Sequence, residues 1–116
     1  MQQNDDFIVL LTTTPDQSTA SSIAKELLTL RLAACVNIID NIKSMYVWEN
    51  EIASDSESQL IIKTTRAQLS DIESLMKKLH PYDVPELIAL TVHSVCTDYG
   101  NWLLDNIKPS VEQPND

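Results

Sequence analysis

Short apolar runs, separated by polar turn-forming residues, are the first pattern along the chain. Each run is too short for a helix and rich in β-branched residues, which is typical of strands. We expect strands at residues 7–13, 33–39, 45–48, 57–64 and 86–92. The second and third runs form one long strand or two, because Asp40 and Asn41 between them suit a turn or bulge. Residues 49–50 then suit a hairpin turn.

Apolar residues at helical spacing lie between these runs and predict two crossover helices. The first stripe comprises Ala20, Ile23, Ala24, Leu27 and Leu28, and the second comprises Leu69, Ile72, Leu75, Met76 and Leu79. A third stripe at Tyr99, Trp102, Leu103 and Ile107 predicts a short terminal helix. The predicted order is therefore βαββαβ followed by a helix.

Polar residues and prolines mark where the helices should begin and end. Residues 14–17 form a capping-box pattern with Thr14 as the N-cap, and Thr65 and Gln68 repeat its spacing before the second helix. Pro81 should end that helix, because proline cannot continue the helical hydrogen bonds. The first helix should end near residue 31.

The element order indicates an α+β fold, a ferredoxin-like βαββαβ sandwich with an extra C-terminal helix. Both crossover helices should pack on one face of an antiparallel sheet. A strand with one face in water alternates apolar and polar residues, yet residues 8–11, 60–62 and 87–90 do not alternate. We therefore expect another copy of the chain to cover the second face. The alternative is that these strands are merely hydrophobic and the C-terminal tail folds over them.

Composition adds limits on organisation and partners. The chain has 116 residues, of which 43% are apolar and 22% charged, as expected for one globular domain. We expect that domain over residues 7–108, with a flexible N-terminus at 1–6 and a flexible tail at 109–116. The formal net charge of -9 argues against nucleic acid and membrane as partners. The sequence shows no signal peptide and no membrane span, so we expect a cytoplasmic protein.

Few residues suit catalytic chemistry. Gly100 is the only glycine, which excludes Gly-rich phosphate-binding loops, and no serine lies in a nucleophile-elbow pattern. We therefore expect no enzyme, and an acylphosphatase-like activity is disfavoured because the first strand-to-helix turn lacks an arginine. Cys35 and Cys96 lack metal-site spacing, and we expect both to be reduced and buried.

The histidines and acidic residues have competing interpretations. His80 either caps the end of the second helix, where the helix dipole favours a cation, or binds a metal ion. His93, at a strand end, is interpreted as structural. The acidic stretch Glu49, Glu51, Asp55 and Glu57 could concentrate cations, but we expect it to be a solvated hairpin tip.

Aromatic and charged residues near the predicted strand ends form a candidate ligand cleft. The set comprises Tyr46, Trp48, Lys63, Tyr82 and Glu86. Such a mixture commonly lines a site for a small polar ligand. The alternative is a subunit interface in which Tyr and Trp anchor a neighbour, and both can hold at once.

Six segments, in order along the chain, carry a resemblance to a known family. They are TTTP at 12–15, RLAACVN at 31–37, SMYVWE at 44–49, KTT at 63–65, HPYDVPE at 80–86 and DYGNWL at 98–103. Together they resemble the CutA family of divalent-cation tolerance proteins, from Phe7 to about Lys108. The resemblance implies a ferredoxin-like fold related to that of PII signalling proteins. It also implies a cytoplasmic homotrimer with the sheets inside and no established catalytic activity.

The resemblance further implies a function in tolerance and response to divalent metal ions such as copper, with a divalent cation as the bound cofactor and no organic cofactor. The five cleft residues match the family's cleft between subunits. The alternative function is a PII-like signalling or scaffold protein that binds a small organic ligand in that cleft.

The family's proposed copper site is only partly present in this sequence. That site uses a cysteine late in the first strand and two adjacent histidines before a Pro-Tyr pair. Thr12 stands at the cysteine position and Leu79 at that of the first histidine, so only His80 remains as the candidate metal ligand. A hydroxyl is a poor substitute for a thiolate toward copper. Cys35 matches a family motif, and its apolar strand suggests core packing.

Overall fold

The computed structural model describes residues 1 and 6–109, and its elements follow the order βαββαβα. The strands are β1 (Phe7–Thr14), β2 (Cys35–Trp48), β3 (Glu51–Thr65) and β4 (Ile88–Thr91). The helices are α1 (Gln17–Thr29), α2 (Leu69–Leu79) and α3 (Thr97–Asp105), with a short 3₁₀ turn, η1 (Arg66–Gln68), before α2. The predicted α+β class and element order are confirmed. Of the flexible ends predicted at 1–6 and 109–116, residues 2–5 and 110–116 lie outside the described residues.

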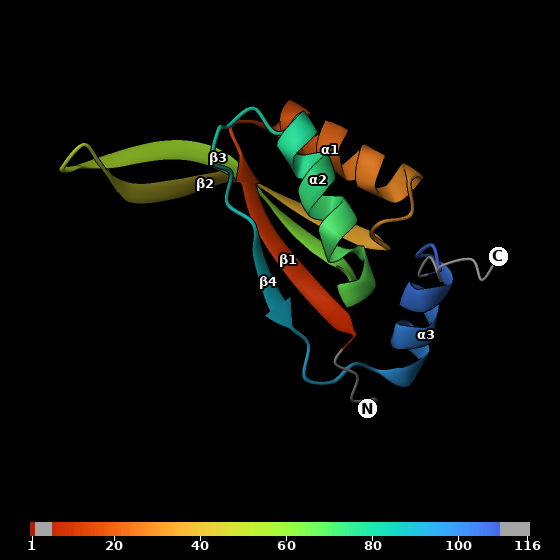
Figure 1. Ribbon diagram of the computed structural model, residues 1–116. Coiled ribbons are helices and arrows are strands. Elements are labelled where there is room, and N and C mark those ends of the chain that lie inside the picture. Colours follow the sequence, from red (N-terminus) through yellow and green to blue (C-terminus); the bar gives the residue numbers. More distant parts are fainter. Residues whose placement is uncertain (2–5, 110–116) are drawn as a thin grey trace.

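The four strands form one antiparallel sheet in the order β2-β3-β1-β4. Helices α1 and α2 pack on one face of this sheet (Figure 1). Period-two alternation directs Ile8, Leu10, Leu60 and Ile62 toward these helices, where all four side chains are buried. Helix residues Ala20, Ile23, Ala24, Leu27, Ile72 and Met76 complete this core. The two sequence stripes thus predicted most of this core, but Leu28 and Leu79, which they also include, are each 41% exposed.

The opposite face of the sheet, called the open face below, is apolar and largely uncovered. Its apolar residues are Val9 and Leu11 of β1, Ile39 of β2, Ile61 of β3, and Ile88 and Leu90 of β4. Helix α3 covers only one end of this face, where Leu103 and Ile107 pack against Phe7. The described residues therefore leave apolar strands exposed, as the missing alternation predicted.

Strands β2 and β3 continue beyond the sheet as a long two-stranded arm (Figure 1). The pairing register shifts between Ile39 and Ile42, where Asn41 adopts a left-handed φ of 59°, so the predicted interruption is a β-bulge. Glu49 and Asn50 form the hairpin turn, with φ of 50° and 66°. β3 begins at Glu51, whereas we expected it at residue 57. The mostly polar stretch 51–56 hid this part of the strand, because both faces of the arm meet solvent in one chain.

Both predicted capping boxes are wrong. Asp16, not Thr14, is the N-cap of α1, and its carboxylate accepts a 2.8 Å hydrogen bond from the Thr19 N–H. Thr14 is the last residue of β1, and its hydroxyl donates to the Asp16 carbonyl instead. Thr65 makes no side-chain cap bond, because the chain first forms a 3₁₀ turn there. β4 is also shorter than predicted, since it begins at Ile88 and not at residue 86.

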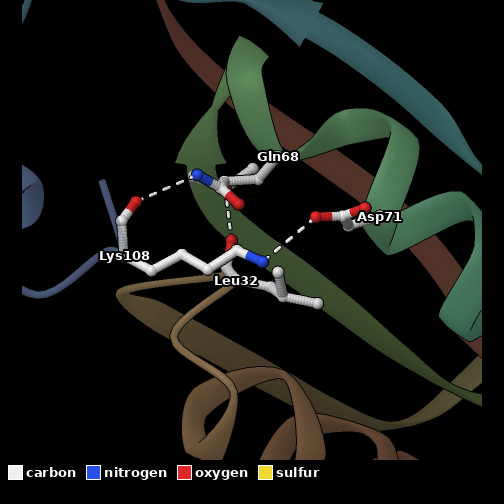
Figure 2. Close-up of polar contacts among 5 residues, drawn as sticks. Leu32, Gln68, Asp71 and Lys108 are labelled. Carbon is white, nitrogen blue, oxygen red and sulfur yellow. Dashed lines mark hydrogen bonds and ion pairs between the residues drawn. The ribbon is translucent and has the colours of Figure 1, made fainter. Parts of the chain in front are cut away.

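Gln68 and Lys108 fasten the segment after α3 to the helical layer (Figure 2). The Gln68 amide donates to the Lys108 carbonyl over 3.1 Å, and the Lys108 N–H donates to the Arg31 carbonyl over 2.9 Å. The Lys108 ammonium pairs with Asp71. Within the described residues, no helix combines the length and apolar character needed to cross a membrane.

Candidate functional site

The loop between α2 and β4 crosses the end of β1 and carries most of the candidate site. Pro81 follows His80, so the residue before proline is driven to extended backbone, and His80 has φ -77° and ψ 133°. The helix therefore ends at Leu79, as predicted. The far end of this loop is attached to β1, because the buried Thr12 hydroxyl donates a 2.6 Å hydrogen bond to the Glu86 carbonyl.

Both ring nitrogens of His80 contact backbone groups. Nε2 lies 2.7 Å from the Thr13 carbonyl oxygen, and Nδ1 accepts a 3.1 Å hydrogen bond from the Tyr82 N–H. The imidazole also packs against the Tyr82 ring, with centroids 4.8 Å apart. His80 is only 7% exposed. Its ring therefore joins the end of β1 to the loop.

Tyr82 extends this contact to the base of the hairpin arm. Its phenol donates a 2.8 Å hydrogen bond to a carboxylate oxygen of Glu57. Burial, followed by this hydrogen bond and the negative charges of Glu57 and Asp55, raises the pKa of Tyr82 to about 12. Glu57 is buried, so the expectation of a solvated acidic stretch is wrong for this residue. The error arose because its partner lies 25 positions away in sequence.

Tyr46 makes a parallel contact further along the arm. Its phenol donates a hydrogen bond to Asp55, and this bond is the main reason why the pKa of Tyr46 is raised above its usual value. Tyr46 and Asp55 lie on paired strands, two register positions apart. The two phenols are also close enough for Tyr46 to contribute to the raised pKa of Tyr82. Two of the five predicted cleft residues therefore meet within one chain.

An open pocket of about 320 Å³ lies beside this cluster, between the start of α1 and the β-bulge. Its lining residues are Pro15, Asp16, Gln17, Asp40, Asn41, Ser56, Glu57 and Ser58. The Ser58 hydroxyl donates to an Asp40 carboxylate oxygen over 3.0 Å. The hydrogen bond from Thr19 lowers the pKa of Asp16, which favours its carboxylate form. The pocket is therefore polar and acidic.

The five predicted cleft residues do not all converge within one chain. Lys63 pairs with Val9 and Cys35 in the middle of the sheet, and Trp48 pairs with Glu51 beside the hairpin turn. Lys63 lies twelve positions after Glu51 along β3, which is about 40 Å of strand. Glu86 is exposed and lies just before β4. One chain therefore cannot bring Trp48 and Lys63 to one ligand.

The candidate metal ligands do not fit a metal site in this chain. Among residues 1 and 6–109, no three side chains of the His, Cys, Asp and Glu types lie close enough together to hold an ion. Thr12 is buried and uses its hydroxyl on Glu86, and Leu79 supplies no ligand atom. The His80 nitrogens already have backbone partners.

The cysteines and His93 lie elsewhere. Cys35 and Cys96 are both free thiols; Cys35 is partly buried and Cys96 is exposed at the start of α3. The prediction that both are buried is therefore wrong for Cys96, because the short loop before α3 leaves its N-terminus in solvent. The expected core packing of Cys35 is also wrong, because its strand register places it beside Lys63 and Val9 on the open face. His93 is exposed just after β4.

The hydrogen bonds between phenols and carboxylates were not predicted from the sequence. Tyr46 and Asp55 had a detectable signal, since a hairpin at residues 49–50 places them on adjacent strands. No sequence signal predicted the contact between Tyr82 and Glu57, because the loop and the strand that carry them come together only in the folded chain. The fold and site thus define a small α+β protein with a polar, acidic pocket, whose lining residue Glu57 is hydrogen-bonded to Tyr82, and a protruding hairpin arm.

Comparison with known proteins identifies the family. The family model described as "CutA1 divalent ion tolerance protein" matches residues 8–106, and the chain belongs to this family. The Thermus thermophilus "Divalent-cation tolerance protein CutA" is 42% identical over 98 residues, which cover 84% of this chain and 95% of that protein. The predicted family resemblance is confirmed.

Solved structures agree in fold. CutA1 from Oryza sativa has a TM-score of 0.88 at 37% identity, covering 90% of this chain and 96% of that one. The Thermus thermophilus structure, titled a divalent cation tolerance protein, has a TM-score of 0.85 at 40% identity and covers 88% and 99% of the two chains. The chain is therefore similar to these proteins over nearly their whole length.

Proposed function

We propose that this protein acts in divalent-cation tolerance as a homotrimer, and that copper is among the cations to which it responds. Family membership over residues 8–106 is the observation that carries the metal-tolerance role. The curated relatives bear the name of divalent-cation tolerance proteins. The absence of catalytic activity and the cytoplasmic location stay predictions.

The open face supports an assembly of several chains. Ile39, Ile88 and Leu90 are each nearly half exposed there, and Leu11 and Ile61 between them are partly buried. An apolar sheet surface of this kind marks an interaction site, because exposing it to water is unfavourable. A trimer with its sheets inside, as the family resemblance implies, would cover it. The same assembly could bring Trp48 of one chain near Lys63 of another.

Cation binding in this proposal is weak. The described residues offer no cluster of three ligand side chains, while the net charge of -9 favours loose association with cations. Calorimetric titration of the metal-free protein with copper and with zinc tests this, and magnesium serves as the control. We expect dissociation constants below about 1 mM for copper and zinc. Absence of binding in that range would overturn the cation-binding part of the proposal.

A second candidate function is a PII-like sensor that binds a small organic ligand between subunits. The polar pocket and its neighbouring pair Tyr46 and Tyr82 favour it. A thermal-shift screen of metabolites tests this function. A ligand present at a hundred times its dissociation constant adds about 2.7 kcal/mol to the unfolding free energy. No shift across a broad screen would count against the sensor function.

A further inference from the structure

His80 is the residue that both the sequence and the family resemblance offer as a metal ligand, yet its surroundings assign it another task. The Thr13 carbonyl can only accept a hydrogen bond, so the Nε2 atom 2.7 Å away must carry the proton. The Tyr82 N–H can only donate, so Nδ1 must present its lone pair. The two partners therefore fix one neutral tautomer of the ring.

This tautomer leaves no nitrogen for a metal. A metal binds the lone pair of an unprotonated ring nitrogen. At Nδ1 that lone pair already accepts from Tyr82, and a metal there would leave a backbone N–H without its partner, which is unfavourable. At Nε2 a metal would displace the Thr13 carbonyl in the same way. With an exposed fraction of 7%, the ring also offers an ion little access.

Neighbouring residues do not offset this cost. The Thr12 hydroxyl is committed to the Glu86 carbonyl, and the nearest buried carboxylate, Glu57, accepts from Tyr82. Thr12 and Glu57 thus already serve to hold the loop. The polar groups form a chain of contacts from β1 through His80 and Tyr82 to β3.

We infer that His80 is a positioning residue, a neutral clamp that fastens the α2–β4 loop to the end of β1 and directs Tyr82 onto Glu57, and that it is not a metal ligand. The inference goes beyond the proposed function and stands independently of it. The contacts of His80 would be the same whether this protein binds cations elsewhere, for example through exposed carboxylates, or binds no cation.

Nitrogen NMR on the unmodified full-length protein tests the clamp directly. Uniform ¹⁵N labelling of histidine, read at neutral pH through two-bond correlations, distinguishes a protonated Nε2 from a protonated Nδ1. We expect His80 to show only the Nε2–H form. A His80 ring in the Nδ1–H form, or one exchanging between both neutral forms, would overturn the inference.

Zinc titration in the same spectrum supplies the second test, and the exposed His93 is its internal control. We expect zinc to shift the His93 signals first or to shift neither ring, while those of His80 stay in place up to about 1 mM zinc. His80 signals that move before or together with those of His93 would assign His80 to a metal site and refute the clamp.

Variants separate the positioning role from simple loss of an imidazole. His80→Ala should lower the thermal midpoint of unfolding by several degrees, whereas His93→Ala should leave it within about one degree of the wild type. Zinc affinity measured by calorimetry should be the same for His80→Ala and the wild type. If His80→Ala does not fold, the tautomer and titration results on the wild type decide the matter alone.

Discussion

The phenol of Tyr82 donates a 2.8 Å hydrogen bond to the Glu57 carboxylate and so joins the α2–β4 loop to the base of the hairpin arm. The contact links residues 25 positions apart, and its donor is a group that titrates. The protonated phenol is the form that the fold favours, because its pKa is raised to about 12. Stability should therefore depend on pH in the alkaline range.

The sign of this dependence follows from the raised pKa. The contribution of Tyr82 is fully present below the unfolded pKa near 10 and is lost as the pH rises toward 12. A shift of two units corresponds to about 2.7 kcal/mol, which solvent screening reduces to roughly 1 kcal/mol because Tyr82 is 37% exposed. Urea unfolding between pH 8 and pH 12 should show this loss for the wild type and not for Tyr82→Phe. Tyr99→Phe controls for removal of a phenol, and an unchanged alkaline limb in Tyr82→Phe would contradict the prediction.

A matched pair of aspartate substitutions tests the open face. Ile39 on that face is 45% exposed and Leu28 on the helical layer is 41% exposed, so the two side chains meet solvent to the same degree in one chain. We expect Ile39→Asp to dissociate the assembly, because a subunit contact would bury the new charge. Leu28→Asp should keep the wild-type mass in sedimentation velocity. Equal masses for both variants would show that the open face is not the interface.

Arg31 occupies a backbone position that favours glycine. Its φ is 56°, and the Arg31 N–H and Leu32 N–H bond the Leu28 and Leu27 carbonyls, which forms a Schellman motif at the end of α1. Left-handed backbone costs a residue with a Cβ about 1–2 kcal/mol, so Arg31→Gly should raise the unfolding free energy by about 1 kcal/mol. Lys25→Gly within α1 should lower it by about 1 kcal/mol. Denaturant unfolding of both variants checks the opposite signs.

Local patterns predicted the parts of this fold that depend on local chemistry. The stripe with Ile23 and Leu27 identified α1 and its buried face, and the turn at Glu49 and Asn50 identified the hairpin. The missing alternation at residues 8–11 correctly indicated an apolar second face. These features need only periodicity or backbone preference within a few residues.

Contacts between residues far apart in the sequence could not be predicted, because their partners meet only in the folded chain. Thr14 looked like a helix cap, yet the pairing of β1 with Ser58 extends that strand through it and leaves Asp16 as the cap. The roles of His80 and Tyr82, in the α2–β4 loop, depend on Thr13 of β1 and Glu57 of β3. Residue types alone could nominate these side chains but could not give their partners.

A buried hydrogen bond between neutral groups and an exposed ion pair both lie near the segment that follows α3. Comparing them tests whether burial decides how much a polar contact stabilises the fold. The Thr64 hydroxyl is buried and donates 2.6 Å to the Leu32 carbonyl, whereas the Lys108 and Asp71 side chains are 35% and 59% exposed. Thr64→Val should lower the unfolding free energy by about 1–2 kcal/mol, because it leaves a buried carbonyl without this donor. Lys108→Met should change it by less than about 0.5 kcal/mol, since solvent and salt screen the pair.

Urea unfolding at low and high salt measures both changes. The effect of Thr64→Val should not depend on salt, because neither group in that bond is charged. The smaller effect of Lys108→Met should vanish at high salt, where the ion pair is already screened in the wild type. If Lys108→Met proved the more destabilising of the two, the ion pair with Asp71 would be the contact that holds this segment, and the ranking by burial would be wrong.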